Sequence, residues 1–202
     1  MDFLSNISDT EAIRLRYNSS LSNIDGLSNL GSLVYSLEII DSQIEDVDSL
    51  SNLTSVGAAL YISGNNSLQH LDGLSSLEYI GGVLVLQDNE ELTNIDGLSS
   101  LQSIAGEYAY GAMTGVHIHN NPTLITLDGF SNTQTIIGGI SLSNNSILNS
   151  ITGLFELLTF EGDINIEYHD DLCQTQVDYF SSLFPNSPSS STMNLGVCND
   201  AD

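Results

Sequence analysis

Two rhythms of apolar and polar residues alternate along this chain. Short segments in which every second residue is apolar begin at Ile13, Leu37, Leu60, Leu84, Val116, Ile140 and Ile164. Elsewhere apolar residues recur at every third position, as at Leu68, Leu71, Leu74, Leu77 and Ile80. The first rhythm predicts short β-strands with their apolar residues inward. The second predicts a coil that turns a corner every few residues and points these side chains into one core.

An LDGL-like motif repeats with the same spacing as the strands. Its copies begin at Ile24, Val47, Leu71, Ile95, Leu127 and Ile151. Successive copies lie 23 or 24 residues apart, except for one step of 32. Two independent elements that share one period indicate a solenoid. Because no single repeat can hide its apolar face, stacking must bury it, at roughly 1.5–3 kcal/mol per large apolar side chain.

Two polar features accompany this repeat. Three residues past the last apolar residue of each strand stand Asn18, Ser42, Asn65, Asn89, Asn121, Asn145 and His169. An inward asparagine at a corner satisfies backbone groups that the turn leaves unpaired. We therefore predict a structural ladder of Asn18, Asn65, Asn89, Asn121 and Asn145. The glycines of the DG pairs, such as Gly73 and Gly97, are expected in turns that need a positive φ.

The repeat has the consensus L-x-I-x-x-N-x-x-L-x-x-L-d-G-L-s-x-L-x-x-I over about Leu4 to Leu172. This pattern resembles the leucine-rich-repeat superfamily and, more specifically, the receptor L domain, a ligand-binding solenoid of growth-factor receptor ectodomains and microbial surface proteins. The resemblance implies a β-rich, right-handed coil with one face of parallel strands, and it carries no catalytic residues. We expect about seven repeats of 23–24 residues over residues 1–172, the first one incomplete.

The N-terminal end of the chain starts inside a repeat. The segment Phe3–Ile7 aligns with Gly26–Leu30 of the following copy. Because a solenoid needs covered ends, we expect this sequence to be part of a longer chain.

A cap is predicted over residues 173–202. Val177, Phe180, Leu183 and Phe184 fall on one helical stripe, which predicts a helix over the last coil. The following tail, residues 186–194, is expected to be a loop. It would return Cys198 to Cys173 for a disulfide, with two free thiols as the alternative. Two cysteines confined to one end favour an oxidising compartment, and hence an extracellular or cell-surface location.

The charge of the chain narrows its partners. Twenty-six acidic residues stand against two arginines and no lysine, a formal net charge of −24. This charge repels nucleic acid and anionic membrane surfaces, and no apolar run is long enough for membrane insertion. Acidic clusters such as Asp88–Glu91 and Glu167–Asp171 permit weak Ca²⁺ binding, although none matches a known calcium loop. We expect no cofactor.

Two surfaces are candidates for ligand binding. The first is the solvent side of the sheet, where the residues differ from coil to coil: Glu38, Ile40, Tyr61, Val85, Gln87, His117, His119, Ser141 and Asn165. Among these, Ile40, Tyr61 and Val85 are expected to be exposed apolar side chains. The second is the insertion of the long repeat, residues 107–114, with Tyr108 and Tyr110. Ordinary surface variation is the alternative explanation for both.

The sequence carries no recognisable catalytic motif, so we expect no enzyme. His117 and His119 have a spacing that can bind a metal, but the next good ligand, Glu167, lies two strands away, roughly 9–10 Å. We therefore expect no metal site. The sequence predicts a non-catalytic extracellular or cell-surface recognition or adhesion module that binds a protein or glycan. A structural spacer within a larger surface protein is the alternative.

Overall fold

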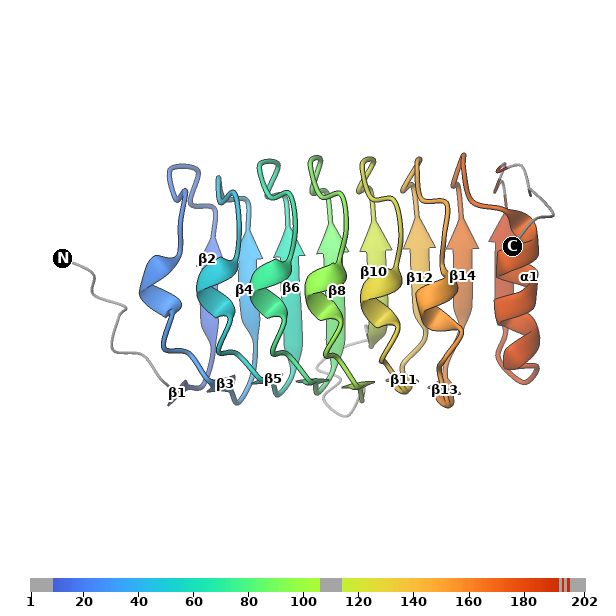
Figure 1. Cartoon of the computed structure of the whole chain (residues 1–202), viewed down its shortest axis with the longest axis horizontal. Coiled ribbons are helices and arrows are strands. Elements are labelled where there is room, and N and C mark those ends of the chain that lie inside the picture. Colours follow the sequence, from blue (N-terminus) through green and yellow to red (C-terminus); the bar gives the residue numbers. More distant parts are fainter. Residues whose placement is uncertain (1–8, 106–113, 193, 195, 197–202) are drawn as a thin grey trace.

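The computed structural model describes residues 9–105, 114–192, 194 and 196. The chain rises as a stack of coils, with a sheet of longer strands on one side and a row of short helical turns on the other (Figure 1). Each coil contributes one longer strand, one 3₁₀ turn and one short strand, as the shared period of the sequence markers predicts.

The longer strands form one parallel sheet in the order β15-β14-β12-β10-β8-β6-β4-β2. Their bounds are β2 Ile13–Arg16, β4 Leu37–Ile40, β6 Ala59–Ser63, β8 Val83–Gln87, β10 Gly115–His119, β12 Ile140–Ser143, β14 Ile164–Glu167 and β15 Ser189–Thr192. The inward apolar positions pair in register from strand to strand, for example Leu60 with Leu84 and Val116 with Ile140. The predicted stacking of identical positions is confirmed.

A second parallel sheet of very short strands runs along another edge of the stack, in chain order. Its strands are β1 Asp9–Thr10, β3 Ser32–Leu33, β5 Ser55–Val56, β7 Tyr79–Ile80, β9 Ser103–Ile104, β11 Thr135–Ile137 and β13 Thr159–Glu161. The sequence predicts only one sheet, because strands of two or three residues are too short to show a period of two.

The LDGL-like motifs form the 3₁₀ turns η1 Asp25–Leu27, η2 Asp48–Leu50, η3 Asp72–Leu74, η4 Asp96–Leu98, η5 Asp128–Phe130 and η6 Thr152–Leu154. The expected positive φ of their glycines is wrong, since none of these glycines lies in the left-handed region. The turns instead need glycine for close stacking. A Cβ on Gly97 would lie 1.8 Å from the Leu71 carbonyl oxygen of the preceding turn.

The core is a continuous column from Ile13 to Phe180, built mostly of leucine, isoleucine and valine with little or no exposed surface. A buried polar ladder borders it. Asn121 shows the pattern: its Nδ2 donates to the Leu86 carbonyl at 3.0 Å, and its Oδ1 accepts the Asn89 backbone N–H at 3.1 Å. Asn65, Asn89 and Asn145 repeat this arrangement. The predicted ladder is confirmed for these four asparagines.

Asn18 is the exception to the ladder. Its side chain is exposed, and its Nδ2 donates to the Arg16 carbonyl two residues earlier. A ladder asparagine donates to the coil before it, and no coil precedes Asn18 among the described residues. At the other end, Asn194 donates to the Ile166 carbonyl at 3.0 Å, as the next rung would. The sequence does not predict this rung.

The last coil is closed by a single helix, α1 Gln174–Leu183, which lies beside β15 at the end of the stack (Figure 1). Val177 and Phe180 are buried against the core as predicted, whereas Leu183 is exposed. The Gln176 side chain forms the hydrogen bonds to the last coil that the backbone of a further coil would otherwise form. It accepts the Ile151 N–H at 3.0 Å and donates to the Asn149 carbonyl at 2.9 Å.

Part of the predicted loop over residues 186–194 is wrong, because Ser189–Thr192 forms β15 and pairs with β14. This strand lacks apolar alternation. Ser191, in the inward register, accepts a hydrogen bond from Gln174 of α1 instead of entering the core. Cys173 is buried at the start of α1. Cys198 lies outside the described residues, so the Cys173–Cys198 pairing stays a prediction.

Candidate ligand-binding face

The side chains that β2–β14 point away from the core form what we call the outer sheet face. Its members are Arg14, Arg16, Glu38, Ile40, Tyr61, Ser63, Val85, Gln87, His117, His119, Ser141, Ser143, Asn165 and Glu167. The pleat of the strands fixes this selection, because residues between two inward positions must point to the other side. Parallel register aligns them in two columns.

An ion-pair cluster occupies the β2 end of this face. Arg14 Nε donates to Glu38 Oε1 at 3.0 Å, and Arg16 pairs with the other carboxylate oxygen of Glu38. Glu38 is only 5% exposed, so the prediction that it faces solvent is wrong. The two arginines of the chain thus converge on one carboxylate, and the guanidinium groups shield it from water.

The middle of the face is apolar and partly aromatic. Val85 is 4% exposed and therefore not the exposed contact residue that the sequence predicts. It lies in register between the larger side chains of Tyr61 on β6 and His117 on β10. Ile40 and Tyr61 remain partly exposed. Burial raises the pKa of Tyr61 above its usual value, and the negative charge of Glu38 adds to this effect against Arg16.

Both histidines of β10 are held by protein groups. His117 Nε2 donates to the Thr114 carbonyl at 3.0 Å, and His119 Nδ1 shares a 2.7 Å hydrogen bond with the Ser143 hydroxyl. Burial lowers the pKa of both rings below the usual value, and for His119 the neighbouring His117 lowers it further. Both rings are therefore neutral at pH 7. Among the described residues, no group of three acidic, histidine or cysteine side chains is arranged to hold a metal.

The β14 end of the face is hydrophilic. Ser190 of β15 donates to Asn165 Oδ1 at 2.7 Å and also lies 2.9 Å from Glu167 Oε1. Next to it, a shallow hollow is lined by groups that include His117, Ser141, Asp163 and Asn165. The outer sheet face is thus divided along its length into a charged end, an apolar middle and a hydroxyl- and amide-rich end.

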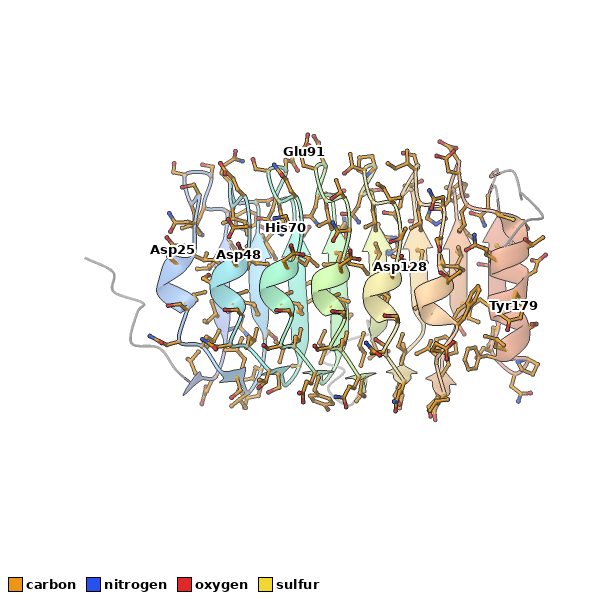
Figure 2. All side chains as sticks on the ribbon, viewed as in Figure 1. Asp25, Asp48, His70, Glu91, Asp128 and Tyr179 are labelled. Carbon is orange, nitrogen blue, oxygen red and sulfur yellow. The ribbon has the colours of Figure 1, made fainter. Side chains whose placement is uncertain are left out.

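The acidic charge of the protein lies mostly elsewhere. Each of the turns η1 to η5 begins with an exposed aspartate, and Asp25, Asp48 and Asp128 line up on the layer opposite the sheet (Figure 2). On the outer sheet face only Glu38 and Glu167 are acidic, and Glu38 is neutralised by its arginines.

A polar groove follows the rim where the longer strands end. Its lining includes Asp41, Gly64, Asp88, Asn120 and Asn144, all in the left-handed region with φ between 51° and 67°. Asn120 donates to Asp88 at 2.8 Å, and Asn144 donates to Asn120 at 3.1 Å. The predictions from the sequence do not include this column, although Asp and Asn directly after a strand are a signal for left-handed backbone. Weak Ca²⁺ binding stays a prediction.

The second candidate surface, the insertion with Tyr108 and Tyr110, lies outside the described residues. Among the residues that the structure does describe, no helix has the length and apolar character needed to span a membrane.

A regular stack whose inward residues repeat while its outward residues vary is the architecture of a recognition solenoid. The comparison with known families agrees with this class. Residues 58–158, half of the chain, match the receptor L domain family. The chain belongs to the receptor L domain family, whose members are non-enzymatic ligand-binding domains in the extracellular parts of receptors. No curated protein matches the chain.

Proposed function

We propose that this protein is a non-catalytic recognition module, exposed outside the cell or on its surface, that binds a protein ligand through the outer sheet face. The observation that supports this most strongly is the separation of charge. In a chain of net charge −24, the outer sheet face carries two glutamates together with both arginines of the chain, so its formal charges cancel. An interface centre is typically depleted in charge and enriched in aromatic residues, which fits the zone around Tyr61.

The zones of the face suggest how a ligand would be oriented. The partly exposed Ile40 and Tyr61 would supply the apolar contact, with the neutral imidazoles of His117 and His119 beside them. Exposed aromatic side chains that are already held by neighbours bind with little loss of conformational entropy. Ser141 and Asn165 would add adaptable hydrogen bonds at the far end.

Capture on arrays of surface-protein ectodomains and of glycans tests this proposal. A protein ligand should bind the wild type, and Tyr61→Ala should weaken that binding about tenfold or more, as for a central interface residue. His117→Ala should act in the same direction. Glu91→Gln is the matched control, because Glu91 is exposed on the rim and away from the face (Figure 2). If the protein captured only glycans, the ligand would be a glycan and the proposal of a protein ligand would be wrong.

A structural spacer is the second function, supported by the continuous core and by the ladder from Asn65 to Asn145. Such a spacer would need no ligand. Failure of both arrays to capture any binder would favour this function, whereas capture that survives both Tyr61→Ala and His117→Ala would direct attention to another surface.

A further inference from the structure

An exposed apolar patch lies at the α1 end of the stack, on the layer opposite the outer sheet face. We call Phe155, Leu158, Tyr179 and Leu183 the terminal patch. Leu158 is 76% exposed, Tyr179 53% and Leu183 36%. The ring of Phe155 meets that of Tyr179 edge-on at 4.9 Å, so the patch bridges the last 3₁₀ coil and α1. Figure 2 shows Tyr179 on the solvent side of α1.

The patch interrupts two polar columns of the solenoid. The residue that follows each 3₁₀ turn is serine in five coils, Ser28, Ser51, Ser75, Ser99 and Ser131, and becomes Phe155 in the sixth. The column that ends at Leu158 is joined by backbone hydrogen bonds through Thr54, Glu78, Gln102 and Gln134. Both columns therefore turn from polar to apolar in the same coil.

Packing explains only one of these changes. Phe155 is partly buried and supports α1 through Tyr179. Leu158 lies between Phe155 and Phe160 in the chain, and Phe160 also contacts the cap, with its ring 5.0 Å from that of Phe184. Leu158 itself remains mostly in water, Tyr179 is about half exposed, and Leu183 keeps about a third of its surface in water. Exposed apolar side chains grouped on the last coil and the capping helix mark an interaction surface rather than a requirement of the fold.

Acidic side chains near the terminal patch determine which charge a partner protein must carry. Glu156, Glu161 and Asp178 are exposed on the same coil and helix. Both arginines of the chain lie at the opposite end of the stack, tied to Glu38. A second copy of the chain would bring a further net charge of −24 to this acidic rim. The complementary partner has an apolar centre surrounded by lysine or arginine.

We propose that the terminal patch is a second interaction surface, which docks an amphipathic segment of a partner protein with an apolar face and a basic rim. This surface does not overlap the outer sheet face, so the inference stands apart from the proposed function. It would let one module hold two partners at once.

A pair of synthetic amphipathic helical peptides tests the inference. One carries leucines on one face and lysines on the other; in the second, glutamate replaces every lysine. Binding to the full chain is measured by fluorescence anisotropy near physiological salt. The variant is Leu158→Gln with Leu183→Gln, which leaves the charge unchanged and places at 158 the residue found at 102 and 134. Val34→Gln is the matched control, because Val34 is 62% exposed at the far end.

The lysine peptide should bind the wild type, and the double variant should weaken it about tenfold, as for loss of a central apolar anchor. Val34→Gln and Tyr61→Ala should leave it unchanged. A photoreactive lysine peptide should cross-link within residues 155–183. Equal binding by the glutamate peptide, an equal loss in Val34→Gln, or cross-links elsewhere would overturn the inference. So would a wild-type dimer in sedimentation that dissociates in the double variant, since the patch would then belong to a second copy.

Discussion

Replacing His169 by asparagine should stabilise the protein, and by more as the pH falls. His169 occupies a fully buried position in the ladder. Its Nδ1 donates to the Asn145 carbonyl at 3.1 Å, while its Nε2 is buried and finds no hydrogen-bond partner among the described residues. The rung before it has no such defect, since Asn145 donates to Ile118 and accepts from the Asn121 N–H.

The size of the effect follows from these two environments. An unpaired buried polar atom costs about 1–3 kcal/mol. Removing the unpaired atom therefore stabilises the variant. Because the asparagine side chain is smaller than imidazole, lost packing offsets part of this stabilisation. We expect His169→Asn to raise the free energy of unfolding by about 1 kcal/mol at pH 7.5, where the imidazole is neutral in both the folded and the unfolded chain.

The pH dependence has a definite sign. Burial lowers the pKa of His169 in the folded protein, with the backbone of Asn145 and Leu142 and the charge of Asp170 opposing this shift. The unfolded chain therefore takes up a proton near pH 6.5, before the folded chain does. The wild type keeps its full stability above about pH 6.5 and loses stability as the pH falls below that value. The advantage of His169→Asn should grow over the same window.

Urea unfolding followed by circular dichroism at pH 7.5, 6.5 and 5.5 measures this advantage. The reverse exchange Asn121→His is the matched control, and it should destabilise the protein by about 2–3 kcal/mol because it removes paired groups from an intact rung. His117 is present in all the proteins compared, whereas His119 is coupled to the replaced residue. Because His169 lowers the pKa of His119, its loss raises that pKa in the folded variant and adds to the advantage at low pH. An advantage of His169→Asn that does not change with pH, or a destabilised variant at pH 7.5, would refute the reasoning.

Three further predictions concern the ladder, the turns and the cap. Asn121→Ala should lower the free energy of unfolding by about 3 kcal/mol in urea titration, since several buried backbone partners lose their bonds, whereas Asn18→Ala should change it by less than about 0.5 kcal/mol. Gly97→Ala should cost about 3 kcal/mol or more, because its Cβ would overlap the Leu71 carbonyl; Ser49→Ala, in a turn that already accommodates a side chain, should cost only about 1 kcal/mol. Intact mass without reductant should show Cys173 and Cys198 joined, and reduction should cost about 3–4 kcal/mol of stability; an unchanged mass after reduction would show two thiols.

The repetitive parts of the fold could be predicted because each signal is present many times. Leu60, Leu84 and Val116 occupy the same position of successive copies, so one register satisfies all of them. The second sheet and β15 could not be predicted in this way. Their strands are short or lack apolar residues, and they form because a neighbouring backbone edge offers hydrogen-bond partners.

For the candidate site, the sequence predicts which side of the sheet each side chain points to, but not how exposed that side chain is. A period of two fixes which side of the sheet Glu38 and Val85 point to, and the pairing confirms that side. Their burial depends on neighbours 22 to 32 residues away: Arg14 and Arg16 cover Glu38, and Tyr61 and His117 flank Val85. A single repeat carries no information about which large side chain its neighbours will place beside it.

The glycine of the DG pair shows how a residue preference can be recognised in the sequence while its physical cause is assigned wrongly. Positive φ and close approach both favour glycine, and one sequence cannot separate them. The η2 turn does separate them. It carries Ser49 where the neighbouring turns carry glycine, and its hydroxyl donates to the Ile24 carbonyl at 3.0 Å. A serine with a left-handed backbone would be strained, whereas a serine in an ordinary 3₁₀ turn needs only room for its side chain. The spacing between coils, rather than the backbone conformation, therefore decides which residue each turn accepts, and the same spacing brings the rungs of the asparagine ladder within hydrogen-bond distance.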